Sequence, residues 1–185
     1  TPIFLQNWSL IFTVLALVGL QNAVNMADGQ NGLVIGLSLV WVLCIAGYAP
    51  AHLMPLLIVL LIGLSIALPF NLKGHLFLGD SGSYGLSMVI GLLSIYVYAV
   101  SFTSLSADVV ALWFLVPIAD CLRLMVMRVL AGRSPFHSDR SHFHHILGSL
   151  MPFKGALTVY LLLVAVPAAL AFWVPNKALL WALIT

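Results

Sequence analysis

Long apolar runs separated by short polar segments dominate this chain, and their order predicts its elements. Six runs are long or nearly long enough to cross a bilayer as helices, which takes about 20 residues. They cover residues 8–27, 33–47, 52–70, 84–102, 109–129 and 156–174. Backbone polar groups in lipid must be satisfied within the segment, and no long stretch alternates with period two. We therefore expect transmembrane helices and not a barrel.

Composition strengthens this reading. The chain is 63% hydrophobic and only 6% charged, whereas a soluble domain carries about 25% charged residues. The expected fold class is all-α: a polytopic membrane helical bundle of about six transmembrane helices, with a truncated seventh starting near Ala178. The net charge of +2 is too small to indicate a nucleic-acid partner.

The cysteines and the chain ends bear on domain organisation. Cys44 and Cys121 fall inside apolar runs, so we interpret them as small buried hydrophobes, not as a disulfide framework. Thr1 is not an initiator residue, and the last run is too short to span a bilayer. We expect residues 1–185 to form a single integral membrane domain belonging to a longer polypeptide.

Basic residues predict the orientation. The connections at 28–32, 71–83 and 130–155 follow odd-numbered spans, so they share one membrane face. That face holds Lys73, Arg128, Arg133, Arg140 and Lys154, with Arg123 close by. The opposite connections contain no lysine or arginine, and only Lys177 lies beyond the last span on that side. The positive-inside rule makes the first face cytoplasmic.

The first polar cluster on this face ends span one. Asn22, Asn25, Asp28 and Asn31 recur every three residues, which on a helix gives one slowly drifting polar stripe. Amide and carboxylate oxygens suit magnesium, which takes one or two protein ligands beside substrate phosphates. Helix capping is the alternative, and it accounts for one or two of these residues but not for four.

The second cluster is Gly79-Asp80-Ser81-Gly82-Ser83, just before span four. Its glycines and hydroxyls are typical of a turn that presents backbone N–H groups to a phosphate, and Asp80 would hold a bridging metal. A capped loop without ligand is the alternative. Gly-Asp-Ser-Gly also surrounds the nucleophile of chymotrypsin-like proteases, but a turn between membrane helices excludes that fold.

The third cluster occupies the predicted Arg/His loop at 130–155. It contains Arg133, Asp139, Arg140, His142, His144 and His145. Arginine matches phosphate geometry, and histidine donates to phosphate or shuttles protons near neutral pH. Two alternatives stay open: a zinc site from His142, His145 and Asp139, and a loop that binds anionic lipid heads.

One charged pair lies inside an apolar run. Asp120 and Arg123 fall on one helical face near the predicted cytoplasmic end of span five. We expect an ion pair that orients the loop beyond, or else a contact with substrate.

These motifs together resemble a known family. They are Asn-Ala-x-Asn-x-x-Asp-Gly-x-x-Gly-Leu at 22–33, Phe-Leu-Gly-Asp-Ser-Gly-Ser at 77–83, and Gly-Arg-Ser-Pro-Phe-x-x-Asp-Arg-x-His-x-His-His at 132–145. In that order they resemble the polyprenyl-phosphate N-acetylhexosamine-1-phosphate transferases (glycosyltransferase 4 family). The last motif is similar to the WecA/TagO branch, and the chain resembles the C-terminal portion of such an enzyme.

The resemblance implies transfer of a sugar-1-phosphate from a UDP-N-acetylhexosamine, with UDP-GlcNAc the expected donor, to polyprenyl (undecaprenyl) phosphate. UMP would be released with Mg²⁺ as cofactor, in the first step of cell-envelope polysaccharide synthesis. The implied location is the bacterial inner membrane with a cytoplasmic active site, and a homodimer is compatible with it.

The resemblance also implies roles for residues. Asn25 and Asp80 would bind the metal, and the catalytic set would be Asp80, Asp28, His142, His144 and His145. Substrate would contact Asn22, Asn31, Arg133, Asp139 and Arg140, with Asn31 near the uracil.

The sequence departs from the family pattern in three ways. Asn31 stands where bacterial members usually have aspartate, and His75 stands where lysine is common. The family's Asp-Asp motif lies in an upstream loop, and this sequence has no such pair. We therefore expect the fragment to be inactive alone, and two other classes stay open: a polytopic transporter or scramblase, and an inactive membrane scaffold.

Overall fold

The computed structural model describes residues 8–135 and 141–173, and every regular element among them is helical. The elements are α1 (Ser9–Ala27), α2 (Leu33–Ala46), the 3-10 helix η2 (Ala51–Leu53), α3 (Met54–Leu72), α4 (Gly79–Val100), α5 (Ala107–Leu130), α6 (Phe143–Leu150) and α7 (Phe153–Trp173). Five described segments are long and apolar enough to cross a membrane: α1, η2 with α3, α4, α5 and α7. The chain is a polytopic helical membrane protein, as the apolar runs predict.

The second predicted span differs from the others. The run at 33–47 forms α2, which has only 14 residues and therefore a length of about 21 Å. That is short of the roughly 30 Å hydrocarbon core of a bilayer. Ten of its residues are buried, from Leu33 to Ile45, and it packs against α3, α4 and α7. The predicted helix is present but is shorter than the expected span, and it is apolar all round because neighbouring helices bury it.

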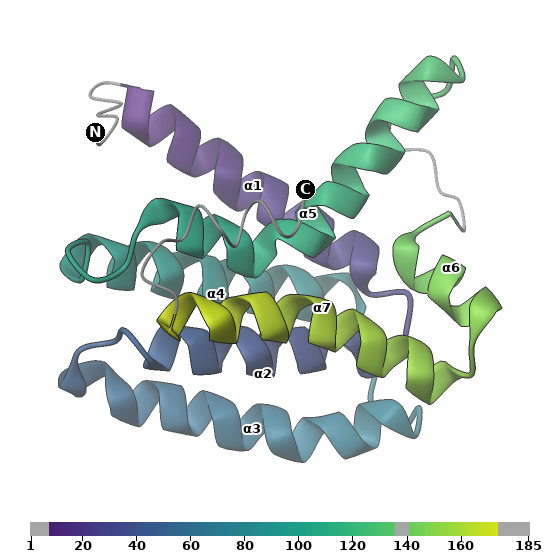
Figure 1. Cartoon of the computed structure of the whole chain (residues 1–185). Helices are drawn as coiled ribbons and strands as arrows, with labels where there is room; N and C mark the ends of the chain where they lie inside the picture. The colour runs from purple at the N-terminus through teal and green to yellow at the C-terminus, as the bar shows by residue number, and fades with distance from the viewer. Residues whose placement is uncertain (1–7, 136–140, 174–185) are drawn as a thin grey trace.

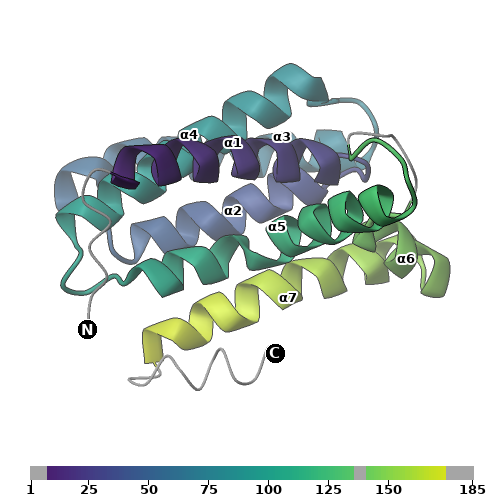
Figure 2. The ribbon, with the colours of Figure 1, turned by 90° about the horizontal axis from the view of Figure 1, so that it is seen from above.

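The helices run roughly side by side, with α2 between α3 and α7 in Figure 1. The turn after α1, the turn before α4 and helix α6 all lie at one end of the bundle, in Figure 1 and in the view from above in Figure 2. The α4–α5 turn lies at the other end. The described parts of the three polar clusters are thus gathered at one end, as their positions between helices predict.

Two predicted boundaries are wrong at this end. Helix α4 begins at Gly79 and not at residue 84, so Asp80 and the neighbouring serines lie in its first turn and not in a loop. A carboxylate there is favourable, because the N-terminal end of a helix carries partial positive charge. The segment predicted as a loop at 130–155 contains α6. The predicted seventh span near Ala178 lies outside the described residues.

Asn71 connects the two turns that carry the first and second polar clusters. Its side chain is buried in the last turn of α3, where Nδ2 donates to the Leu76 carbonyl oxygen at 2.8 Å. Its Oδ1 accepts a hydrogen bond from the Gly32 backbone N–H. Gly32 has a φ of +82°, which favours glycine, and a Cβ there would also displace the Leu72 side chain, since it would lie 2.4 Å from Leu72 Cδ2.

Helix α5 directs its C-terminal part away from α1. Pro117 lies inside it, and proline removes a backbone hydrogen bond and bends a helix. The bend is visible in Figure 1, where the end of α5 diverges from the bundle. Asp120 and Arg123 follow the proline, so the bend sets where this pair meets α6.

We expect Asn71→Ala to lower the free energy of unfolding by about 1–3 kcal/mol, because it leaves a buried N–H and a buried carbonyl without partners. Thermal unfolding in detergent measures the change. Thr13→Ala is the control, since Thr13 bonds only to the Ser9 carbonyl oxygen of its own helix. Equal melting temperatures for the two variants would contradict the bridging role of Asn71.

Candidate active site

Asn25 joins α1 to α4. Its Nδ2 donates to Asp80 Oδ1 at 3.0 Å and to Ser83 Oγ at 2.9 Å, and Ser83 Oγ in turn donates to the Asp80 carbonyl oxygen at 3.2 Å. Residues 55 positions apart in the chain therefore share one hydrogen-bond network. The sequence pattern predicted that Asn25 and Asp80 act together, and the structure brings them into contact.

Asp28 adds a second carboxylate to this region. It is the C-cap of α1 and is partly buried. Burial, and then the negative charge of Asp80, raise the pKa of its carboxyl to about 6. Two carboxylates that oppose each other's ionisation are a suitable place for a cation.

A third carboxylate ties α5 to α6. Asp120 is buried, and its two oxygens accept hydrogen bonds from Arg123 Nη2 (2.8 Å), the Phe143 backbone N–H (3.1 Å to each oxygen) and His142 Nδ1 (3.1 Å). Arg123 Nη2 also donates to the Ser141 carbonyl oxygen at 2.6 Å. The predicted ion pair of Asp120 and Arg123 is confirmed, and it does orient the segment beyond α5.

The three histidines of α6 and its N-cap lie together. The rings of His142 and His144 are stacked, with centroids 5.6 Å apart, and His144 and His145 are 4.2 Å apart. His144 is 3% exposed, and neither of its ring nitrogens has a hydrogen-bond partner. Burial, and then the neighbouring histidines, lower its pKa to about 4. His144 is therefore neutral at physiological pH.

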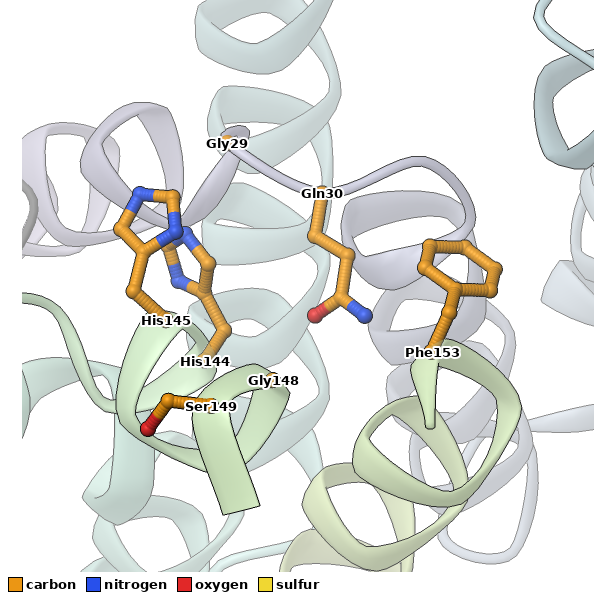
Figure 3. Close-up of a pocket in the computed structure, with 7 residues that line it drawn as sticks. All are labelled: Gly29, Gln30, His144, His145, Gly148, Ser149 and Phe153. Atoms are coloured by element: carbon orange, nitrogen blue, oxygen red, sulfur yellow. The ribbon is translucent and has the colours of Figure 1, made fainter. Parts of the chain in front are cut away.

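A pocket of about 410 Å³ opens between this histidine cluster and the turn after α1. It is lined by Gly29, Gln30, His144, His145, Gly148, Ser149 and Phe153 (Figure 3). The Gln30 side chain extends between the histidines and the Phe153 ring, and its Oε1 is buried without a partner. Gly29 makes the close approach possible, because a Cβ there would lie 2.6 Å from His144 Nε2. Unpartnered buried polar atoms are expected where a ligand or water binds.

The remaining predicted residues have other hydrogen-bond partners or surroundings, or lie outside the described residues. Asn22 Nδ2 bonds back to the Val18 carbonyl oxygen of its own helix. Asn31 follows the end of α1, so the expected continuous stripe is interrupted, and its amide faces the turn at Gly74. Arg133 is exposed in the turn after α5. Asp139 and Arg140 lie outside the described residues.

Sequence reasoning missed three residues of this region. Gln30, Phe153 and Ser149 line the pocket, yet none belongs to a charged or histidine-rich pattern. Gln30 lies inside the first motif at a position where the motif specifies no residue type, and this position was the only sign of a functional role. Phe153 begins a membrane helix, where an aromatic residue is common and does not indicate a binding site.

The side chains that could donate to a metal bear on the choice between the two predicted metals, zinc and magnesium. In the ranges 8–135 and 141–173, no group of three or more His, Cys, Asp or Glu side chains is arranged to hold a metal ion. His142 and His145 therefore complete no zinc site with described residues, and the third predicted ligand, Asp139, lies outside them. Magnesium, which needs fewer protein ligands, is compatible with Asp28, Asp80 and Asn25.

Comparison with known proteins gives consistent matches. The model of glycosyl transferase family 4 matches residues 2–98. The chain is 34% identical over 166 residues to a decaprenyl-phosphate N-acetylglucosaminephosphotransferase of Mycolicibacterium smegmatis. This match covers 77% of the present chain and 41% of the relative. It is 34% identical over 140 residues to a probable undecaprenyl-phosphate N-acetylglucosaminyl 1-phosphate transferase of Bacillus subtilis, with 73% and 39% covered.

A third relative is an undecaprenyl-phosphate alpha-N-acetylglucosaminyl 1-phosphate transferase of Yersinia pestis, 32% identical over 157 residues, with 77% of this chain and 42% of the relative covered. The chain thus spans about two fifths of the length of the curated relatives it matches. No solved structure matches it.

We expect His144→Gln to make stability less dependent on pH between about 4 and 6.5. The pKa of His144 is lower in the folded protein than its ordinary value of 6.5. Between these two pKa values the imidazole is protonated in the unfolded chain but not in the folded protein. The contribution of His144 to the free energy of unfolding is therefore fully present above pH 6.5 and is lost as the pH falls toward 4.

Melting temperatures in detergent across this pH range test the expectation. The raised pKa of Asp28 changes the free energy of unfolding with pH in the opposite direction. This effect is common to the unaltered protein and the His144→Gln variant, so it cancels when the two are compared. His75→Gln, at an exposed position, is the matched control. Parallel curves for His144→Gln and the unaltered protein would show that His144 does not titrate as described.

Proposed function

The chain belongs to glycosyl transferase family 4, and from that premise we propose that the protein transfers N-acetylhexosamine-1-phosphate from a UDP-sugar to polyprenyl phosphate and releases UMP. N-acetylglucosamine is the sugar we propose, and undecaprenyl or decaprenyl phosphate is the acceptor class. The names of the relatives from Mycolicibacterium smegmatis and Bacillus subtilis support both choices. The product would start a cell-envelope polysaccharide.

The observation that carries the proposal is the arrangement at one end of the bundle. Asn25 and Asp80 are in contact across α1 and α4, and Asp28 lies within electrostatic reach of Asp80. One residue further along, Gly29 lies against His144 at the wall of the pocket. An anionic site and a neutral polar pocket thus share one turn. Such a pair suits a substrate with a diphosphate at one end and a sugar at the other.

The proposed cofactor is Mg²⁺, held by Asp80 and Asn25 with Asp28 beside them. The argument that these residues suit a divalent cation rests on the two carboxylates. The charge of Asp80 disfavours ionisation of Asp28, and a divalent cation between them would reverse that effect. When bound, the ion would neutralise charge on the diphosphate, which is the main requirement of phosphoryl transfer. Within the protein, Asn25 keeps the Asp80 carboxylate in place through its amide N–H.

The pocket suits the uncharged sugar better than the phosphates. Neutral His144 offers one donor and one acceptor, and the Gln30 amide offers the unpartnered acceptor Oε1 beside its N–H donors. A hydroxyl or an acetamido N–H satisfies these atoms, and the Phe153 ring supplies an apolar wall for a methyl group or sugar face. Arg133 and Arg140 are proposed to reach the phosphates from the segment after α5.

We further propose that this end of the bundle faces the cytoplasm at a bacterial plasma membrane. Lysines and arginines gather on the connections at that end, as the positive-inside rule requires. A transporter would gather its polar groups near the middle of the bilayer. Here Asn25 is near the end of α1, Asp80 is in the first turn of α4 and two of the histidines are in α6, and these segments lie toward one end of the bundle (Figure 1). The one-sided arrangement favours the transferase.

We expect Asp80→Asn in the complete protein to lower the rate of UMP release by about a hundredfold or more, because it removes a charge that holds the cation. The assay supplies UDP-N-acetylglucosamine, undecaprenyl phosphate and Mg²⁺. Asp108→Asn, an exposed aspartate in the first turn of α5, is the matched control. Turnover by Asp80→Asn equal to the control at saturating Mg²⁺ would contradict the metal role.

A screen of several UDP-sugars with the unaltered protein tests the substrate itself. Release of UMP only in the presence of both polyprenyl phosphate and a UDP-N-acetylhexosamine is the expected result. Absence of release with every UDP-sugar tested would overturn the proposed function.

A further inference from the structure

Asp120 and His142 form a buried pair to which the proposed function above assigns no role. Asp120 Oδ2 lies 3.1 Å from His142 Nδ1, and the side chains are 8% and 9% exposed. The two residues come from α5 and from the N-cap of α6, 22 positions apart. Their contact is shielded from water, so it is stronger than the same contact at the surface.

The other partners of Asp120 hold it in one orientation. Arg123 donates to Oδ1 through both Nη2 and Nε, at 2.8 and 3.3 Å. The Phe143 backbone N–H donates to both oxygens at 3.1 Å. His142 makes no side-chain cap of its own at the start of α6, so Asp120 supplies an acceptor there from the neighbouring helix. A fixed carboxylate gives the imidazole a fixed orientation.

This arrangement determines where the ring proton of His142 lies. An ionised carboxylate only accepts hydrogen bonds, so the nitrogen that faces it must carry the proton. In the neutral ring, Nδ1 is then the donor and Nε2 keeps its lone pair. His142 stacks on His144 at an interplanar angle of 10°, so its orientation also sets that of the buried ring on the pocket wall.

We propose that Asp120 is a positioning residue that holds His142 in the tautomer with the proton on Nδ1 and so leaves Nε2 as the atom that accepts a hydrogen bond or a proton during sugar-phosphate transfer. The proposal rests on the proposed function for its role in turnover. The tautomer itself follows from the geometry alone.

Nitrogen-15 NMR of histidine-labelled complete protein in detergent tests the tautomer, with His142→Ala to assign the signal. We expect a proton on Nδ1 at every pH at which the protein is folded. An unprotonated Nδ1 in the unaltered protein would overturn the proposal, and this result does not require activity.

Asp120→Asn tests the link to turnover. The asparagine oxygen can still accept from the Phe143 N–H, but its amide then faces His142 Nδ1 as a donor and favours the opposite tautomer. We expect kcat to fall at least about tenfold, with a much smaller change in KM for UDP-N-acetylglucosamine. The spectrum should show the proton moved to Nε2. Asp108→Asn should leave kcat, KM and the spectrum unchanged.

A double-mutant cycle separates positioning from simple support of α6. If Asp120 acts through His142, adding Asp120→Asn to His142→Ala should cost little further kcat. Fully additive losses would mean that Asp120 only stabilises the fold, and would overturn the proposal. If the unaltered protein transfers no sugar phosphate but shows the Nδ1 proton, the proposed function fails while the tautomer assignment stands.

Discussion

Asn25 on α1 donates hydrogen bonds to both Asp80 and Ser83 of α4, and the arrangement of the proposed cation site depends on that contact. It fixes where α1 ends relative to the first turn of α4, and therefore where the turn from Asp28 to Gly32 runs. Asn71 holds the far side of the same turn through the Gly32 N–H. With both sides of the turn fixed by amide side chains, Gly29 can lie against His144 without a gap. Amides suit this task because they connect helices without adding charge to a region that already holds two carboxylates.

Among the described residues, three carboxylates lie at this end, and their different surroundings imply different tasks. Asp120 is surrounded by donors: a guanidinium, a backbone N–H and an imidazole. Its charge is thus compensated within the protein, which suits a positioning residue. Asp28 has the opposite surroundings, because burial and a second carboxylate both raise its pKa. A pair of that kind is stabilised only by a proton or a cation from outside, which suits a binding site.

The sequence predicted most of the helices because lipid leaves the backbone no other structure, and it predicted the grouping of polar clusters because chain direction alternates between spans. It did not predict that α2 is short, since burial by protein and burial by lipid select the same side chains at Leu33 to Ile45. Helix α6 was hidden within a polar segment, because its eight residues are too few for a clear period. Asn71 was missed because one amide at the end of an apolar run has no pattern, and its two contacts come from separate turns. Patterns within short stretches of sequence were readable, and the family motifs also paired Asn25 with Asp80, but the contacts of Asn71 between elements were not predicted.

The common boundary of the anionic site and the pocket has a consequence for the proposed reaction. Asp28 and Gly29 are consecutive, so a substrate with its diphosphate beside Asp80 and its sugar beside His144 must place the phosphate that bears the sugar at this turn. Gly29 contributes only backbone there, and the His144 ring lies directly against it, because a Cβ at Gly29 would be 2.6 Å from His144 Nε2. The reacting phosphorus would then meet the Gly29 backbone with the His144 ring beside it. A side chain at this position would displace the ring, so glycine keeps the cation site and the histidines within reach of one substrate.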